Sequence, residues 1–424
     1  MARPGAWPVL LLLFSINLLN YIDRYVLSGV LPLVEKAFPG VSKEQLGWLA
    51  PAFLIVYMLT SPVFGFLGDR MARKILVGLG VQLWSLATAA AGMARSFAQL
   101  FISRMFVGVG EAAYGTTAPT IISDLYPKSS RGRALALFYV AIPAGSALGY
   151  LLGGVVGEGW SWRAAFWVVG LPGLLVGLAA YFIREPTRGA TEEVDEQELA
   201  RFLQRRPRLR DYLDLFRVKS FMLNTLGMTA YTYSIGGIAY WMPTFLHQER
   251  HLPLAKANFQ FGLVTVGTGI VGTLAGGQIA DRLARRVRGA YFLVCGVSML
   301  LAAPAFYVAM LSPTPWIYWT ALVVAELFLF VNTGPGNTIL VNVTLPDVRT
   351  TAFAVNIFII HALGDVLSPV IMGATADRSS LANAFLQTGG VVVLSGLLWA
   401  AGTPFLGRDT DRVRERMEES ASPG

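Results

Sequence analysis

Cysteine, histidine and charged side chains are all scarce in this sequence. One cysteine, Cys295, excludes an internal disulfide and a cysteine-rich metal site. The three histidines are scattered, so we expect neither a metal nor a cofactor; they are His247, His251 and His361. Charged residues make up 14% of the chain, against roughly 25% in soluble domains. Too few polar side chains are therefore present to cover a water-facing surface, and much of that surface is expected to face lipid.

Long apolar runs fill the chain, which is 54% hydrophobic. A helix needs about 20 mostly apolar residues to cross a bilayer. The first run resembles a signal peptide, but it continues to Leu33 without a small-residue cleavage site, so we interpret it as a span. The sequence predicts an all-α membrane protein with twelve spans, over 8–33, 46–67, 75–94, 98–119, 134–156, 164–183, 221–246, 259–280, 290–311, 316–340, 352–374 and 385–406.

Lysine and arginine placement predicts the orientation. If the N-terminus is cytoplasmic, the cytoplasmic segments hold 25 of the 34 basic residues and the external loops hold 7. Cytoplasmic loops of membrane proteins carry the excess of basic residues. Both termini are therefore predicted to be cytoplasmic.

The predicted spans group into two six-helix bundles. We expect an N-terminal bundle over 1–186, a cytoplasmic linker over 187–218, a C-terminal bundle over 219–407 and a cytoplasmic tail over 408–424. The linker is the one long hydrophilic stretch between spans, and it is predicted to form a short amphipathic helix around 192–206 near the inner leaflet; a plain solvated tether is the alternative. The chain is expected to be a monomer.

A ten-residue pattern occurs twice, 212 residues apart, at equivalent span ends. Gly65–Lys74 and Gly277–Arg286 both read Gly-x-x-x-Asp-Arg-x-Ala-Arg-basic. Duplicated halves are a transporter architecture, and the pattern resembles the signature loop of the major facilitator superfamily. Its carboxylate can accept bonds from arginines or from a helix N-terminus, whereas simple anchoring of basic residues is the alternative. The predicted conformational gating residues are Gly65, Asp69, Arg70, Arg73, Arg133, Asp281 and Arg282.

Six charged residues lie inside the predicted spans, where charge is costly and usually functional. At about 1.5 Å per residue, Asp23 lies roughly 20 Å into the first span. Arg104 and Glu111 are seven residues apart and therefore share one helix face. Two ion pairs that hold helices together are the alternative, but a buried pair rarely adds net stability over apolar packing. We therefore favour a role in ligand or proton handling for the N-terminal set, which is Asp23, Arg24, Arg104 and Glu111.

The C-terminal half carries no lysine or arginine inside its predicted spans, but it has Glu326, His361 and Asp365. His361 precedes Asp365 by one turn, so a hydrogen bond between them is possible; a satisfied core histidine and a proton carrier are both open. The stretch 332–337 interrupts span ten with glycine and proline. Backbone groups freed there must find side-chain partners or line a cavity. In span five, Gly145, Gly149 and Gly153 are spaced for close helix packing.

Three stretches resemble the Spinster family. They are Asn20-Tyr21-Ile22-Asp23-Arg24 with Gly29–Pro32, Arg104 with Gly108–Ala112 and Ala118–Thr120, and His361–Asp365 with Ser368-Pro369. The resemblance implies export of lysolipids or sphingoid phosphates in animal members, and a substrate- and proton-responsive cluster of Asp23, Arg24, Arg104 and Glu111. Short tails without organelle-sorting signals look bacterial, which places the chain in the inner membrane.

The sequence as a whole predicts a secondary active transporter that works by alternating access. We expect proton-linked transport of an anionic amphiphile; the alternative is a proton-coupled symporter of small organic anions. An enzyme, a sensor and a channel are less favoured, since no nucleophile–base pair, metal cluster or repeated pore-lining pattern is visible. The expected partners are the anion, protons and membrane lipids, without nucleic acid. Candidate substrate-binding residues are Asn20, Arg24, Arg104 and Tyr114, and candidate proton-coupling residues are Asp23, Glu111, Glu326, His361 and Asp365.

Overall fold

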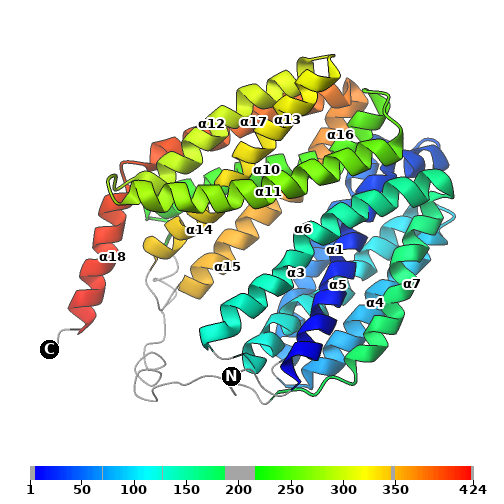
Figure 1. The fold of residues 1–424 in the computed structure, drawn as a ribbon, viewed down its shortest axis with the longest axis horizontal. Helices are drawn as coiled ribbons and strands as arrows, with labels where there is room; N and C mark the ends of the chain where they lie inside the picture. Colours follow the sequence, from blue (N-terminus) through cyan, green and yellow to red (C-terminus); the bar gives the residue numbers. More distant parts are fainter. Residues whose placement is uncertain (1–4, 69, 127, 187–214, 345–348, 422–424) are drawn as a thin grey trace. The chain divides into compact units, whose positions relative to one another are not determined.

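The computed structural model describes residues 5–68, 70–126, 128–186, 215–344 and 349–421, and this part of the chain is helical throughout its regular structure (Figure 1). The contacts divide the chain into two compact units. Unit 1 comprises Met1–Glu193, Ala239–Val266 and Pro369–Leu381, and unit 2 comprises Val194–Ile238, Gly267–Ser368 and Ala382–Gly424. Unit 1 therefore includes short segments from the predicted C-terminal bundle as well as the whole N-terminal one.

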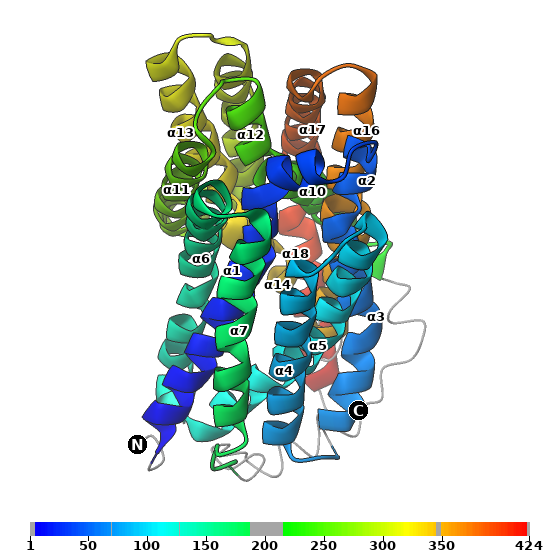
Figure 2. The same cartoon turned by 90° about the vertical axis from the view of Figure 1, so that its right-hand side faces the viewer.

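Seven helices form the main part of unit 1. Their bounds are α1 Ala6–Ala37, α2 Lys43–Gly47, α3 Leu49–Gly68, α4 Arg73–Gly92, α5 Phe97–Leu125, α6 Lys128–Gly159 and α7 Trp162–Ala180. Ser42, Ser96 and Ser161 cap α2, α5 and α7 by accepting a hydrogen bond from a backbone N–H of the first turn. The most extensive packing joins α1 to α6, α3 to α5, and α4 to both α5 and α7, as Figure 2 shows.

Glycines of α6 bring its backbone against α1. A Cβ on Gly145 would lie 2.6 Å from the Tyr21 Cβ, and one on Gly149 would lie 2.7 Å from the Ile22 carbonyl oxygen. Atoms do not approach so closely, and only glycine allows this helix spacing. The prediction that these small residues serve packing is confirmed, and the close approach fixes the middle of α1, where the charged residues lie.

The remaining helices, most of them in unit 2, are more often interrupted. The bounds are α10 Lys219–Gln248, α11 Leu254–Ala284, α12 Ala290–Leu311, α13 Pro315–Val331, α14 Thr333–Asn342, α15 Arg349–Ile360, a π-helical turn η1 His361–Asp365, α16 Ser368–Arg378, α17 Leu381–Gly402 and α18 Leu406–Ala421. Parts of α10 and α11 and most of α16 belong to unit 1. The predicted interruption of span ten over 332–337 is shorter than expected: Asn332 alone separates α13 from α14, and 333–337 form the start of α14. There Asn224 donates to the carbonyl oxygen of Gly336 at 3.0 Å.

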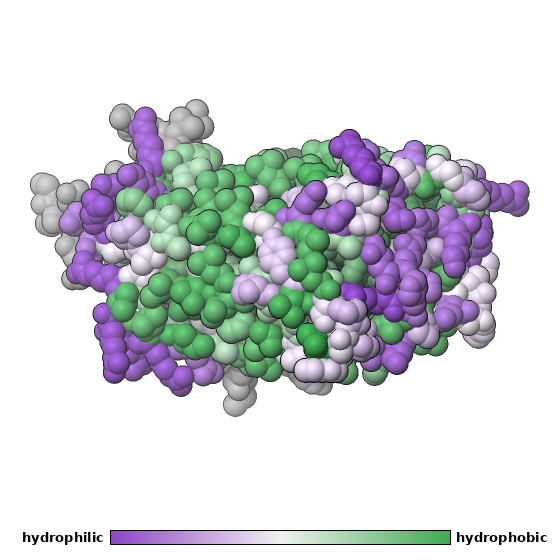
Figure 3. Space-filling model, turned by 90° about the horizontal axis from the view of Figure 1, so that it is seen from above, coloured by the Kyte–Doolittle hydropathy of each residue, from purple (hydrophilic) through white to green (hydrophobic). Residues whose placement is uncertain are grey.

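A helix, continuous or interrupted, covers each of the twelve predicted spans. Among the described residues, ten helical segments are long and apolar enough to cross a membrane. The other two spans are α5, which carries Arg104 and Glu111, and α10, which is rich in hydroxyl side chains. Large apolar residues are exposed, including Leu175 at 72%, and Figure 3 shows apolar residues across the middle of one face. Lipid is the solvent that suits such a surface.

The predicted linker helix and the predicted C-terminal tail have different outcomes. The amphipathic helix expected around 192–206 lies outside the described residues. The segment expected to be a tail contains α18, which docks on unit 2: Asp409 accepts a hydrogen bond from the backbone N–H of Ser220 at 2.9 Å. A carboxylate at the first turn of α10 is favoured by the exposed N–H groups there, so α18 is part of the fold.

Candidate functional site

Two helices supply the charged cluster of unit 1. Asp23 and Arg24 lie side by side in α1, so their side chains point in directions about 100° apart around the helix. Arg104 and Glu111 lie two turns apart on α5, and they face α1. Each residue of the adjacent pair on α1 therefore meets a different partner on α5. The four-residue set Asp23, Arg24, Arg104 and Glu111 is called the charge cluster below.

The charge cluster contains two ion pairs between α1 and α5. The Arg24 Nη2 lies 2.7 Å from the Glu111 Oε2, and the Arg24 Nε donates to the same oxygen at 2.8 Å. The Arg104 Nη1 donates to the Asp23 Oδ1 at 3.3 Å. The other oxygen of Asp23 accepts a hydrogen bond from the hydroxyl of Thr88 on α4 at 2.9 Å. Asp23 thus pairs across the helix interface rather than with its neighbour Arg24.

The cluster is buried, yet several of its polar atoms lack hydrogen-bond partners. Asp23, Arg104 and Glu111 are each 1% exposed. Within the described residues, no hydrogen bond is made by the Nε of Arg104, the Oε1 of Glu111 or the Nδ2 of Asn20, one turn before Arg24. Asn20 lies close enough to interact with the Glu111 carboxylate, but without hydrogen-bond geometry. Buried polar groups are almost always satisfied, so these atoms make the charge cluster a candidate site.

Aromatic rings enclose the guanidinium of Arg24. Its Cζ lies 4.8 Å from the ring centre of Phe53, 5.0 Å from Tyr21 and 5.5 Å from Tyr57. Sequence reasoning missed Phe53, Tyr57 and Thr88. The spacing of Phe53 and Tyr57, four residues apart in a predicted span, was an available signal for a shared face. Thr88 carried no such signal, because many threonines occur in the spans.

Tyr114 lies in the packed core of unit 1. It is 2% exposed, and its hydroxyl donates to the backbone carbonyl of Leu13 at 2.6 Å. Its ring also meets Trp84 edge to face, with centres 5.5 Å apart. The hydroxyl is therefore already used within the fold, and the predicted role of Tyr114 in substrate binding stays a prediction.

The candidate proton-coupling residues of the C-terminal half lie in unit 2. The Nδ1 of His361 lies 2.9 Å from the Oδ2 of Asp365, at opposite ends of η1. A π-helical turn inside a span often marks a functional position. Glu326 on α13 is 1% exposed and accepts a hydrogen bond from the hydroxyl of Thr268 on α11 at 3.2 Å.

Within the described residues, no group of three His, Cys, Asp or Glu side chains is placed to hold a metal.

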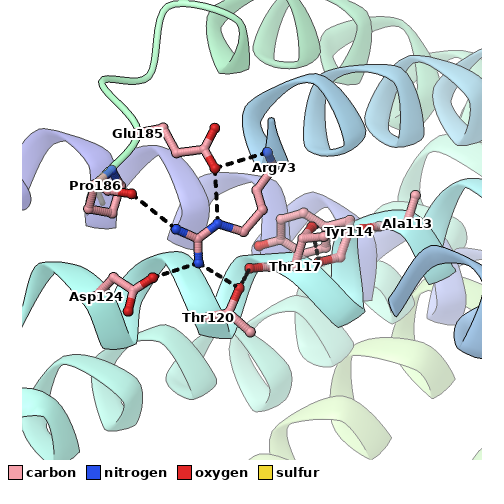
Figure 4. A network of polar contacts seen from close by, with 8 residues as sticks. All are labelled: Arg73, Ala113, Tyr114, Thr117, Thr120, Asp124, Glu185 and Pro186. Carbon is pink, nitrogen blue, oxygen red and sulfur yellow. Dashed lines mark hydrogen bonds and ion pairs between the residues drawn. The ribbon is translucent and has the colours of Figure 1, made fainter. Parts of the chain in front are cut away.

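Among the predicted gating residues whose side chains the structure describes, Arg73 is the one that is buried in a polar network (Figure 4). Its Nη1 donates to Asp124 at 2.7 Å and to the hydroxyl of Thr120 at 3.2 Å. Its Nε donates to Glu185 at 3.0 Å, and its Nη2 donates to the carbonyl of Pro186 at 3.2 Å. Arg73 therefore joins the start of α4 to the end of α5 and to the segment after α7.

The other gating candidates make fewer contacts or cannot be placed. Asp69 and the side chain of Arg133 lie outside the described residues. Arg70 is exposed, with its Cζ 3.5 Å from the ring centre of Phe66. A Cβ on Gly65 would meet no atom within 4 Å. Asp281 accepts a hydrogen bond from the Tyr291 hydroxyl at 3.1 Å, and Arg282 is exposed.

Comparisons with known proteins agree with this architecture. The sequence pattern of the Major Facilitator Superfamily matches residues 13–369. The chain is 36% identical over 386 residues to protein spinster homolog 3 of Danio rerio, covering 87% of this chain and 76% of that protein. It is 34% identical over 432 residues to protein spinster homolog 3 of Homo sapiens, covering 94% and 83%.

Solved structures show the same fold. A bacterial homolog of the human lysosomal transporter Spinster, in an inward-facing and unoccupied conformation, matches with a TM-score of 0.83 at 23% identity, over 98% of this chain and 99% of that one. A D-xylose–proton symporter matches with a TM-score of 0.73 at 16% identity, over 95% and 99%. The chain is an integral membrane protein that belongs to the major facilitator superfamily and, within it, to the Spinster family of transporters.

Proposed function

We propose that this protein is a secondary active transporter that moves an anionic amphiphile by alternating access, together with a proton. Arg24 and Arg104 bind the anionic head group, and Glu111 takes up the proton. The observation that carries the proposal is the set of buried polar atoms without partners in the charge cluster. Arginine suits the head group because its planar donors match phosphate and carboxylate oxygens.

Charge balance links the anion to the proton. The charge cluster holds two carboxylates and two guanidinium groups, so its formal charge is zero. An anionic head group that pairs with Arg24 displaces Glu111 as the partner and leaves one uncompensated negative charge in buried surroundings. A proton on Glu111 removes that charge. Anion binding and proton binding therefore favour each other, and by linkage the effect is mutual.

The amphiphilic nature of the substrate rests on the contrast between the two halves. All lysine and arginine inside the predicted spans belongs to the N-terminal half, so the cation-free, phenylalanine-containing spans of the C-terminal half suit an apolar tail. The resemblance to the Spinster family implies export of lysolipids or sphingoid phosphates in animal members, and these molecules carry a single chain on an anionic head. His361, Asp365 and Glu326 are the proposed second group of protonatable residues. We place the protein in a bacterial inner membrane with both termini cytoplasmic.

A competition experiment tests the substrate class. Purified protein is incubated with a fluorescent lysophosphatidic acid, and unlabelled competitors are added. Oleoyl lysophosphatidic acid should displace the probe, whereas lactate and succinate at millimolar concentration should not. Displacement by the short acids at similar concentrations would instead favour a symporter of small organic anions.

A further inference from the structure

Aromatic rings and one carboxylate surround the guanidinium of Arg24. Aromatic rings attract a cation from their faces, and Phe53, Tyr21 and Tyr57 all lie within 5.5 Å of the Arg24 Cζ. Glu111 occupies Nε and Nη2. Among the described residues no acceptor bonds to Nη1, so an incoming oxygen first meets the guanidinium at this nitrogen, before the head group displaces Glu111 from the other two.

Helix α5 is shaped to bring the aromatic pair of α3 to this place. A Cβ on Gly108 would lie 3.0 Å from the backbone nitrogen of Tyr57 and still closer to the carbonyl oxygen of Phe53. A Cβ on Gly115 would lie 2.8 Å from the hydroxyl oxygen of Tyr57. The two glycines are seven residues apart on α5 and share the face of Glu111. They make room for the α3 backbone and for the tyrosine hydroxyl, respectively.

The position of Gly115 locates that hydroxyl. It lies against α5 one turn beyond Glu111, on the helix face that carries the carboxylate bound to Arg24. Within the described part of the chain it has no hydrogen-bond partner, and Tyr57 is partly exposed. The tyrosine of the core behaves differently, because the Tyr114 hydroxyl is bonded to Leu13. Tyr57 therefore brings an unused donor to the edge of the charge cluster.

We propose that Tyr57 is a specificity-determining residue, whose hydroxyl donates a hydrogen bond to the anionic head group that Arg24 holds. Phe53 and the ring of Tyr57 fix the guanidinium, and the hydroxyl adds a second donor beside Nη1. Two donors from different helices favour a head group with several acceptor oxygens, which is a phosphate monoester or a carboxylate. This inference rests on the proposed binding of an anionic amphiphile.

Binding of ligands that differ only in the head group, measured on full-length protein, tests the role of Tyr57. Three probes with the same oleoyl chain are used: lysophosphatidic acid, oleic acid and monoolein, the last of which is neutral. Affinities are measured by microscale thermophoresis for wild type, Tyr57→Phe, Arg24→Ala and Tyr181→Phe. Tyr181 is the matched control, because its hydroxyl donates to Gln82 at 3.0 Å on the α4–α7 side. Size-exclusion chromatography and thermal unfolding confirm that each variant is folded.

Tyr57→Phe keeps the ring and removes the hydroxyl. It should weaken lysophosphatidic acid binding about tenfold or more, the usual effect of losing a hydrogen bond to a charged group, and leave monoolein binding unchanged. Tyr181→Phe should match wild type. If Arg24→Ala loses the anions but Tyr57→Phe keeps wild-type affinity for them, the role of Tyr57 is wrong while the proposed function stands. A wild type that binds monoolein as tightly as lysophosphatidic acid would overturn both.

Discussion

The charge cluster is unusual because its charges are paired but its hydrogen bonds are incomplete. Removing ions from water is costly, and a buried ion pair rarely repays that cost in stability. Asp23 is well supported, by Arg104 and Thr88. Glu111 has one oxygen bonded to Arg24 and one that has no hydrogen-bond partner in the part of the chain that the structure describes. Of the two carboxylates, Glu111 is therefore the one whose surroundings favour exchange of partners.

Arg24 should be required for binding of an anionic lysolipid. Arg24→Ala should lower the affinity about 100-fold or more, since truncating one member of a buried charge pair costs about 2–5 kcal/mol. Arg24→Lys should recover little, because a point charge does not reproduce the guanidinium fork. Equilibrium binding measures both, with Arg288→Ala as the control. Arg288 is an exposed arginine that also forms an ion pair, with Asp411 at 2.9 Å.

If the role of Arg24 is structural, variants of Arg24 and Glu111 should show different effects on stability and on lysolipid binding. If the residue only neutralises Glu111, the double variant Arg24→Gln with Glu111→Gln should restore stability and binding together. Recovery of lysolipid affinity in that double variant would contradict the head-group role. Recovery of thermal stability alone is what the proposed function predicts.

Glu111 should set the pH dependence of anion binding. The wild type should bind an anionic lysolipid more tightly as pH falls, because a proton on Glu111 compensates for the loss of Arg24. Glu111→Gln mimics the protonated residue, so its affinity should vary little with pH and stay near the low-pH value of wild type. Binding isotherms from pH 5 to 8 measure this, with the exposed Asp411→Asn as control. A wild-type slope that persists in Glu111→Gln would remove Glu111 from the proton step.

At the scale of helices, apolar runs and turn residues predict most of what is seen. The spans follow from the length of the apolar segments. The break at Asn332 lies three residues before Pro335, which has no N–H to donate to the preceding turn. The π-helical turn η1 is not encoded locally: a Cβ on Gly236 of α10 would lie 2.5 Å from the Asp365 Cβ, so tertiary packing shapes this turn. Helix α18 was also missed, because its docking depends on Asp409 meeting the first turn of α10.

The Arg73 network should stabilise unit 1. Arg73→Gln leaves the carboxylates of Asp124 and Glu185 without their shared cation in a poorly solvated place, and breaking such pairs costs about 3–5 kcal/mol. We therefore expect a clear drop in the unfolding temperature in detergent. Arg70→Gln, three residues earlier in the same motif, is the matched control, and as an exposed residue it should change little. Equal unfolding temperatures for the two variants would contradict a structural role for the network.

Asp377 in unit 1 binds the start of α2 in the way that Asp409 in unit 2 binds the start of α10. Asp377, near the end of α16, accepts hydrogen bonds from the backbone N–H groups of Lys43 and Glu44 at 2.8 Å each. Glu35 of α1 adds contacts to Lys43 at 2.5 Å and to Gln248 at 2.7 Å. These bonds hold the ends of α10 and α16 against α1 and α2.

Asp377→Asn should weaken this contact, because the amide can accept on one atom only and the helix start favours negative charge. Spin labels at positions 44 and 378, in a Cys295→Ser background, report the distance between α2 and α16. The variant should show a larger population at longer distances than its parent. Distance distributions that coincide would mean that Asp377 does not hold these elements together.

At the scale of the whole molecule, the two copies of the repeated motif differ in the contacts that their side chains make. Arg73 is buried in a network, whereas Arg285, the same position of the second motif, is exposed. Asp281 is bonded to Tyr291 of the next helix. Cations inside the predicted spans belong to the first half alone. The two copies of the motif share a fold position but make different contacts.

The members of the charge cluster could be predicted from the sequence, but their pairing could not. The four members of the charge cluster could be named because charge inside a span is rare, and Arg104 and Glu111 could be placed on one face from their spacing. Which carboxylate pairs with which arginine could not be predicted, since it depends on how α1 rotates against α5. The same holds for Phe53, Tyr57 and Thr88, which reach the cluster only through helix packing.

The central claim is that an anion and a proton bind together. Isothermal titration calorimetry of lysophosphatidic acid into purified protein, repeated at one pH in buffers of different ionisation enthalpy, counts the protons taken up on binding. The measurement is repeated with Glu111→Gln. We predict uptake of about one proton per lysolipid in wild type and close to none in the variant. Tight binding by wild type with no proton uptake would contradict it.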